Sequence, residues 1–366
     1  MGTFDLGENS PHRGMMRTLR ALLVSSLAAA SMLGSAAHAA RSSKPILLDR
    51  SGGFAIGGAT LTNPNNTQQT LSCDHGYVEY FLPWTPRRTS LVMWHSSSTQ
   101  VFQNRWDGGE GFKDMFLRRD YPVYLWDGPR VGRANFACAP QTYRPWYRDQ
   151  GNFAGWNFGP RFPRWWPDVQ FPANDTRAWD QAMRARYDEM DTADNVQLQT
   201  DAAALAADSG KLGGDIVYLT NSAGGLRALM TVVKSNATNI KGIVAYECIG
   251  SVFPQREDSP RAWGGGFGPF QVPVDEFKKL AKLKAIQFVW GDHRNANASE
   301  VQNTQKMANF INEYGGNAEV VSLKRDYGLA GNTHIAFADM NNEQVGAVLE
   351  SFLKTNQLDS YAERDL

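Results

Sequence analysis

The chain has 366 residues, enough for one large α/β domain or two smaller ones. Hydrophobic residues make up 42% of it and charged residues 20%, a composition typical of a globular, enzyme-sized protein. Positive and negative side chains balance to a formal net charge of zero. This balance favours neither nucleic acid nor an anionic membrane surface as a partner.

Residues 1–39 predict a signal peptide. A basic region at 17–20 precedes a short apolar run at 21–24, and the segment closes on an Ala-x-Ala cleavage pattern at 37–39. The apolar run is too short and too rich in alanine to predict a membrane-spanning helix. We therefore expect an exported protein, secreted or periplasmic.

Two methionines, Met15 and Met16, stand directly before the basic region, so that translation starting at one of them is an alternative to a start at Met1. In either case the mature chain is expected to begin near Ala40, and residues 40–366 are expected to form one domain.

Export makes disulfides feasible, and the chain has three cysteines. At most one bridge can form. We expect it between Cys73 and Cys138, because Cys248 falls at the end of an apolar strand. The spacing of the cysteines does not fit a structural zinc site.

Strand and helix patterns alternate along residues 40–366. The later strands are nearly continuous apolar runs, as expected of parallel strands that are covered on both faces. The alternation predicts an α/β fold with a mostly parallel, doubly wound sheet. We expect strands at 53–57, 77–82, 90–94, 123–126, 215–219, 242–246, 286–290 and 318–323, and helices at 112–119, 177–190, 226–234, 301–313 and 345–354.

An aromatic-rich insertion at about 139–175 interrupts this alternation. The segment is rich in Pro, Gly and Arg as well, and it is too long for a plain connection. It lies on the side of the sheet where α/β folds bind ligands. Two interpretations remain open: a cap or lid that walls an apolar substrate pocket, and an aromatic satellite core.

The most informative motif begins with the strand at 215–219 and continues as Thr-Asn-Ser-Ala-Gly-Gly, with Ser222 at its centre. A strand, a turn of small residues with one serine and a helix follow one another, which is the layout of a nucleophile elbow. Thr220 stands where glycine is usual. The motif alone therefore also fits an ordinary turn in which Ser222 caps the helix.

A serine nucleophile needs a base, and the best-placed histidine is His334. It lies in the loop at 331–335, after the last strand and before the final helix. In the chain order serine, acid, histidine, an α/β hydrolase carries its base there. The alternative is a surface histidine in a polar loop.

Two carboxylates compete for the role of the acid that orients the base. Glu247 ends the strand at 242–246, and Asp292 ends the strand at 286–290. Generic topology leans slightly to Asp292, and either residue could instead cap a helix or solvate a loop. The backbone N–H of Ala223 is the expected first oxyanion donor, and the loop at 95–99 should carry the second.

At this point the sequence resembles the esterase 713-like family of secreted bacterial α/β hydrolases. The resemblance covers most of the mature chain and rests on a combination of short motifs. These are His95, Asp107-Gly108, Phe-Leu-Arg-Arg at 116–119 with Tyr121, Asp-Gly-Pro-Arg-Val-Gly-Arg at 127–133, Phe-Gly-Pro-Arg-Phe-Pro at 158–163, Gln-Phe-Pro at 170–172 and Gly-Asn-Thr-His at 331–334.

The resemblance implies carboxylic-ester hydrolysis by a serine esterase with the triad Ser222, Glu247 and His334. It thereby selects Glu247 over Asp292 as the acid. No cofactor and no metal are expected, and the expected partner is a small-molecule ester.

The resemblance also implies that the second oxyanion donor is the N–H of Ser97. Relatives carry two adjacent cysteines, joined as a vicinal disulfide, where this chain has Ser97 and Ser98. Ser96 replaces the glycine before them. The rigid element of the oxyanion loop is therefore absent here.

Two rival functions stay open. One is a non-catalytic small-molecule-binding protein on the same fold, with the aromatic segment as its recognition surface. The other is a related enzyme, a lactonase or an acyltransferase. A homodimer is compatible with the sequence, which does not specify the oligomeric state.

Overall fold

A computed structural model describes residues 45–95, 98–143, 145–187 and 190–362. The predicted signal peptide at 1–39 and the predicted oxyanion residue Ser97 lie outside the described residues. Within the described ranges, no helix is both long enough and apolar enough to cross a membrane.

The centre of the fold is an eight-stranded sheet. Strand β4 runs antiparallel to both of its neighbours, β1 and β6, while every pairing from β6 across to β12 is parallel. The mostly parallel sheet is therefore confirmed. In spatial order its strands are β1 (Leu48–Ile56), β4 (Gly76–Pro83), β6 (Val123–Asp127), β5 (Thr89–His95), β7 (Asp215–Asn221), β8 (Ile240–Tyr246), β11 (Ala285–Trp290) and β12 (Ala318–Ser322).

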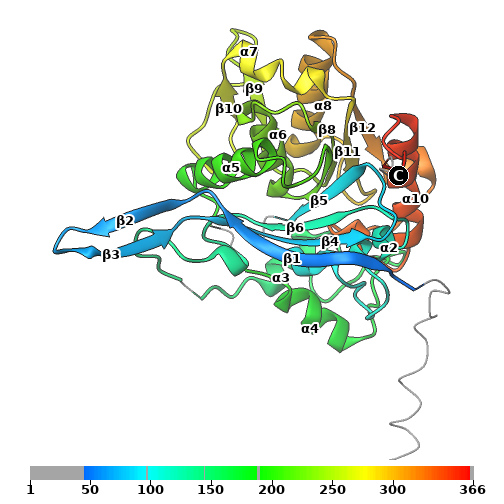
Figure 1. Ribbon diagram of the computed structural model, residues 1–366. Coiled ribbons are helices and arrows are strands. Elements are labelled where there is room, and N and C mark those ends of the chain that lie inside the picture. Colours follow the sequence, from blue (N-terminus) through cyan, green and yellow to red (C-terminus); the bar gives the residue numbers. More distant parts are fainter. Residues whose placement is uncertain (1–44, 96–97, 144, 188–189, 363–366) are drawn as a thin grey trace, which may run out of the picture. The chain divides into compact units, whose positions relative to one another are not determined.

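Helices cover both faces of this sheet (Figure 1). Successive strand residues point to opposite faces, so that Leu91 and Met93 join one core while Val92 and Trp94 join the other. On the first face lie α2 (Phe112–Leu117), α3 (Asp149–Gly155), α4 (Thr176–Arg184) and α10 (Asn342–Thr355). On the second lie α5 (Ala193–Asp208), α6 (Ala223–Lys234), α7 (Val274–Phe277) and α8 (Ser299–Glu313), while the short α9 (Leu323–Tyr327) follows β12 directly.

All eight predicted strands are present in the structure, and the first begins earlier than expected, at Leu48. Four additional strands were not predicted. Two of them form a hairpin, β2 (Ala59–Asn63) and β3 (Asn66–Cys73), whose Thr, Asn and Gln side chains are mostly exposed and show no apolar alternation. The other two are the short parallel pair β9 (Val252–Pro254) and β10 (Phe270–Val272).

The helix predicted at 177–190 is wrong in its second half. It ends at Arg184, and Met190 has a positive φ of 46°, which no α-helix contains. A separate helix, α5, follows at 193–208 and was not predicted. Its alanines give little apolar periodicity, although alanine is the strongest helix former. These small side chains allow α5 to pack closely against α6 and the sheet.

The aromatic-rich insertion is partly core. Phe153 and Phe158 are fully buried, and the ring of Trp165 stacks on that of Phe171 with centroids 5.2 Å apart. Trp165 also meets Phe153 edge to face at 4.7 Å. The satellite-core interpretation therefore holds for these four rings, while residues 161–164 are exposed and Trp146, in the first part of the insertion, is 74% exposed.

The expected disulfide between Cys73 and Cys138 is confirmed. It fastens the end of β3 to the beginning of the insertion. Beside it, both carboxylate oxygens of Asp74 accept hydrogen bonds from Arg130, at 2.8 and 3.0 Å. Cys248 is a buried free thiol, and burial raises its pKa to about 12, so that it stays protonated.

Candidate active site

The carboxyl ends of β5, β7 and β8 lie in one row. The register pairs His95 with Asn221, and Asn221 with Tyr246. Ser222 directly follows β7, and Glu247 directly follows β8. The chain passes from β5 out to β6 and then back to β7 on the other side of β5. Open α/β sheets bind ligands in the crevice at such a switch point.

Ser222 forms the turn between β7 and α6 with φ 55° and ψ −134°. A positive φ is strained for a residue other than glycine, and such strain is typical of functional turns. The backbone holds it in place: the N–H of Ser222 donates to the carbonyl of Tyr246 at 3.1 Å, and its own carbonyl accepts from the N–H of Ile249 at 3.0 Å. The Ser222 side chain makes no capping hydrogen bond to the helix, so the capping alternative is wrong.

Gly225 lets α6 lie against the end of β8. A Cβ atom at this position would meet the sulfur of Cys248 at 2.5 Å and the Cβ of Ala245 at 3.3 Å. Thr220, which replaces the usual glycine before the serine, is fully buried inside the strand. The small residue that the tight turn needs is therefore on the helix side of Ser222. Ala223 is the first residue of α6, where the N–H groups have no carbonyl partner within the helix.

The imidazole of His334 faces the carboxylate of Glu247. The two residues are 3% and 1% exposed, and His334 Nδ1 lies 3.4 Å from Glu247 Oε2. Because Nδ1 faces the acid, Nε2 is the nitrogen left for a reacting group. Asp292 lies elsewhere: its Oδ1 accepts from the N–H of Gly331 at 2.9 Å, and its Oδ2 pairs with Lys324 at 3.2 Å.

Glu247 is held as a buried anion. Its Oε1 accepts from the N–H of Gly291 at 2.8 Å, and its Oε2 accepts from Arg294 Nε at 3.1 Å. Burial raises the pKa of Glu247, but the hydrogen bond with His334 and the charge of Arg294 outweigh it, so that the pKa lies below its usual value. The carboxylate is therefore ionised and can stabilise a positively charged imidazole.

The backbone of His334 is fixed on both sides. Its N–H donates to the carbonyl of Trp156 at 2.8 Å, and its carbonyl accepts from Asn221 Nδ2 at 2.8 Å. The same Asn221 amide donates to the carbonyl of Tyr246, one residue before Glu247, at 3.1 Å. The indole of Trp156 is nearly parallel to the imidazole, with centroids 6.2 Å apart. Sequence reasoning missed Asn221, although a polar residue at the end of an apolar strand, directly before the serine, was a signal.

His95 begins the loop that was expected to hold the second oxyanion donor. Its Nδ1 accepts from the N–H of Ser98 at 3.2 Å, and its ring interacts with the Asn221 side chain. Burial, followed by the nearby charge of His334, lowers the pKa of His95 to about 3. His95 is therefore a neutral group that links the loop to β7.

The loop that carries His334 is anchored by a buried carboxylate, Asp339. It accepts from the N–H and the hydroxyl of Thr333 at 2.7 and 2.8 Å, and from Asn332 Nδ2 at 3.1 Å. At the start of this loop, Gly331 has φ 78°, and a Cβ there would lie 1.8 Å from the carbonyl oxygen of Asp168. Only glycine fits at this position.

Within the described residues, one group of side chains has the composition of a metal site: Asp168, Asp292 and His293. These side chains already have partners in the protein. His293 Nε2 contacts Asp168 Oδ1 at 2.9 Å, and Asp292 is occupied by Gly331 and Lys324. We assign no metal to them.

A cavity of about 640 Å³ adjoins the insertion. Its walls include Trp146, Met183, Tyr187, Arg186 and Phe267. The guanidinium of Arg186 lies 5.7 Å above the ring of Trp156, the indole that stacks on His334. Arg186 and Trp156 therefore lie between this aromatic-walled cavity and His334, whereas Ser222, Glu247 and His334 are not among the residues that line it.

The solved structures that this chain is similar to include one described as a novel bacterial esterase. At 23% sequence identity, the two align with a TM-score of 0.66 over 86% of this chain and 98% of that one. The chain has the α/β-hydrolase fold. Numbered along the chain, the eight strands of the sheet follow one another in space in the order 1-2-4-3-5-6-7-8, and Ser222 directly follows the fifth of them, β7.

Other solved structures match less well. MenH from S. aureus is 12% identical, with a TM-score of 0.42 over 76% of this chain and 98% of that one. Naproxen esterase (carboxylesterase NP) from Bacillus subtilis is 11% identical, with a TM-score of 0.42 over 83% and 92%. No protein-family model matches the sequence, and a search of curated protein sequences finds no relative.

The buried Asp339 should make stability depend on pH. Burial raises its pKa to about 7, against the hydrogen bonds from Thr333 and Asn332, whereas the unfolded chain has the ordinary value of about 4. Since the folded pKa is the higher one, the stabilisation is complete below about pH 4 and is lost as the pH rises to about 7. This pH-dependent part of the free energy of unfolding amounts to a loss of about 2 kcal/mol between about pH 5 and about pH 8, and Asp339→Asn should abolish it.

Urea unfolding of both proteins at the two pH values measures this difference. Asp326→Asn is the control: the hydrogen bond from Arg325 lowers the pKa of that carboxyl, so it does not titrate in this window. If Asp339→Asn and the parent protein show the same change with pH, the assignment to Asp339 is wrong.

Proposed function

We propose that this protein is a serine hydrolase that cleaves carboxylic esters through an acyl-enzyme on Ser222. One observation carries the proposal: a strained serine at a strand-to-helix turn and a buried Glu247 each directly follow the register pair Asn221 and Tyr246, and Glu247 faces His334. A serine, a histidine and an ionised acid are the set that nucleophilic acyl transfer needs.

In the first half of the reaction, Ser222 Oγ attacks the ester carbonyl while His334 Nε2 takes its proton. Glu247 stabilises the imidazolium that forms. The N–H groups of Ala223 and, as the resemblance implies, Ser97 stabilise the negative oxygen of the tetrahedral intermediate. His334 then returns the proton to the departing alcohol, which leaves the acyl group on Ser222.

In the second half, water replaces the alcohol. His334 takes a proton from the water as its oxygen attacks the acyl carbonyl, and a second tetrahedral intermediate forms. Its collapse breaks the bond to Ser222 and returns the proton to the serine. The products are one carboxylic acid and one alcohol, and no cofactor takes part.

The proposed substrate class is a small ester with an apolar or aromatic part. The aromatic side chains of the cavity beside the insertion support this, because Trp146, Tyr187 and Phe267 can pack against such a group. The similar solved structure described as a bacterial esterase supports ester hydrolysis.

We also propose that the protein is exported, secreted or periplasmic, with residues 1–39 as the signal peptide. The disulfide between Cys73 and Cys138 supports this location, because disulfides persist in oxidising compartments.

The first test is covalent labelling by a fluorophosphonate, which reacts only with an activated serine. We expect one label per chain on Ser222, found by peptide mass analysis, and none in Ser222→Ala. A folded protein that takes no label would support the rival function, a non-catalytic binding protein. Product analysis with an added alcohol would separate a hydrolase from an acyltransferase. Hydrolysis of a lactone, compared with that of an open-chain ester, tests the lactonase alternative.

The second test compares the two carboxylates. Glu247→Gln should lower kcat by about 10³- to 10⁴-fold, because the imidazolium loses its charged partner. Asp292→Asn should be mild, because an amide oxygen can still accept from Gly331. Ester hydrolysis by both purified variants measures this, with circular dichroism as a check on folding, and the opposite ranking would make Asp292 the acid.

The third test concerns Asn221, which we expect to be a positioning residue. Asn221→Leu keeps the size but leaves the carbonyl of His334 without its side-chain donor and the carbonyl of Tyr246 with only the N–H of Ser222. We expect kcat to fall by about 10- to 100-fold with KM nearly unchanged, since a small misplacement of reacting groups costs this much. Thr220→Val, the neighbouring buried substitution, is the matched control. If both variants lose stability equally and retain kcat, Asn221 has only a structural role.

A further inference from the structure

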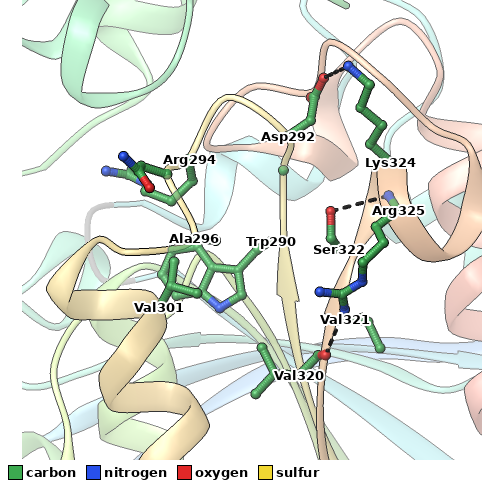
Figure 2. A pocket seen from close by; sticks show the side chains of 12 residues that line it. Trp290, Asp292, Arg294, Ala296, Val301, Val320, Val321, Ser322, Lys324 and Arg325 are labelled. Carbon is green, nitrogen blue, oxygen red and sulfur yellow. Dashed lines mark hydrogen bonds and ion pairs between the residues drawn. The ribbon is translucent and has the colours of Figure 1, made fainter.

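A second cavity lies at the carboxyl ends of β11 and β12, beside the first turn of α8, and it has a volume of about 410 Å³. Figure 2 shows its apolar part, which is formed by Trp290, Val301, Val320 and Val321. Cavities of this size typically hold small ligands, and the carboxyl edge of a parallel sheet is where such ligands bind.

The polar part of this cavity offers mainly hydrogen-bond donors. Lys324 and Arg325 line it with side chains that are 57% and 67% exposed, and Arg294 lines it with a side chain that is 18% exposed. The acidic lining residue, Asp292, has both oxygens occupied, by Gly331 and by Lys324 (Figure 2 shows the contact with Lys324).

These cations are only partly neutralised. Lys324 has three N–H donors and uses one on Asp292. Arg294 uses Nε on Glu247 and Nη2 on the carbonyl of Gly155, while its Nη1 has no partner among the described residues. Arg325 is held by Asp326 through Nε and Nη2 and by the carbonyl of Val320. The remaining donors belong to Lys324 and Arg294, two residues that line a cavity with an apolar part, and this combination fits an organic anion better than an inorganic one.

We propose that this cavity binds a small carboxylate with an apolar body, such as a monocyclic aromatic or medium-chain acid. The apolar body lies against Trp290 and the valines, and the carboxylate meets Lys324 and Arg294. Acids of this kind are the products of the proposed ester hydrolysis, so that a bound product could inhibit the enzyme. This inhibition by product rests on the proposed function, whereas the binding of the acid does not.

Occupancy of the cavity is coupled to the site around Ser222 through Arg294. The guanidinium that would meet the carboxylate also binds Glu247 Oε2 at 3.1 Å, and a second anion competes for it. Asp292, at the cavity wall, holds Gly331 at the start of the His334 loop. A bound acid is therefore expected to lower kcat without competing with the ester for Ser222.

The binding test uses Ser222→Ala, so that it does not depend on activity. Titration with 4-fluorophenylacetate, followed by ¹⁹F NMR, should show saturable binding, and the neutral 4-fluorophenylacetamide should bind about five- to tenfold more weakly. Val301→Trp should abolish this binding by filling the cavity. Its control is Gln305→Trp, on the exposed side of α8, which should bind like the parent protein.

A second pair of variants tests whether the positive charge of Lys324 contributes to binding. It also keeps the proposal testable if Val301→Trp does not fold. Lys324→Gln should weaken binding by about threefold to fivefold, and Lys306→Gln, an exposed charge on α8 that does not line the cavity, should have no effect. The proposal is overturned if Ser222→Ala does not bind the acid. It is also overturned if Val301→Trp and Lys324→Gln, made in Ser222→Ala, bind the acid as tightly as Ser222→Ala itself.

The kinetic test uses the parent protein and an ester substrate. The acid should lower kcat at constant KM, and Val301→Trp should be insensitive to it. Purely competitive inhibition would place the acid at Ser222 and overturn a separate site. If the protein neither reacts with a fluorophosphonate nor hydrolyses esters, yet binds the acid in the cavity, the proposed function fails while the binding site stands.

Discussion

The side-chain amide of Asn221 joins three segments of this fold that are far apart in the sequence. It extends from the end of β7, directly before Ser222, to the carbonyl of Tyr246 on β8 and to the carbonyl of His334. Both residues are buried, and without this amide the carbonyl of His334 would lose its donor, which costs about 1–3 kcal/mol for a buried carbonyl. The parallel register fixes the spacing of β7 and β8, and the amide adds the histidine loop, which no strand pairing reaches. The placement of the nucleophile, acid and base candidates therefore depends on one neutral side chain.

The insertion contributes to the same arrangement from the other side. Its aromatic residues are core in one half, where Phe153 and Phe158 are fully buried. Trp156, between them, accepts the N–H of His334 on its carbonyl and lies beside the imidazole. The two interpretations of this segment from sequence are therefore compatible, because the packing that buries the phenylalanines also positions a ring against the histidine.

The sequence was informative where local patterns decide the structure. The apolar strands, their alternation with helices, the elbow at Ser222 and the loop of His334 all follow from residues that are close together in the chain. The choice between Glu247 and Asp292 did not, because both residues end neighbouring parallel strands. That choice depends on which carboxylate faces the histidine loop in space, and only the family resemblance favoured Glu247 before the geometry was known.

Other features had no local signal of comparable strength. Asp339 and Thr333 are 6 residues apart in the sequence, Arg294 and Glu247 are 47 apart, and Asn221 and His334 are 113 apart. The helix at 193–208 was missed because alanines satisfy close packing without an apolar stripe, and the hairpin of β2 and β3 because both of its faces are polar and exposed. The polar partners and the helix at 193–208 depend on tertiary contacts, whereas the hairpin makes few core contacts that a sequence pattern could reflect.

The backbone strain at the candidate site has a consequence for protein engineering. Ser222 and Glu247 both have positive φ angles, 55° and 47°, and both directly follow a buried strand. Glycine tolerates this conformation without steric cost, so a selection for heat resistance alone rewards glycine at Ser222. At Glu247 the same exchange would leave the largely buried Arg294 and the N–H of Gly291 without this acceptor, which costs more than the strain. Such a selection would therefore enrich proteins that fold well, keep Glu247 and have lost the serine for which the strain at position 222 is maintained. Libraries built on this scaffold should keep position 222 fixed.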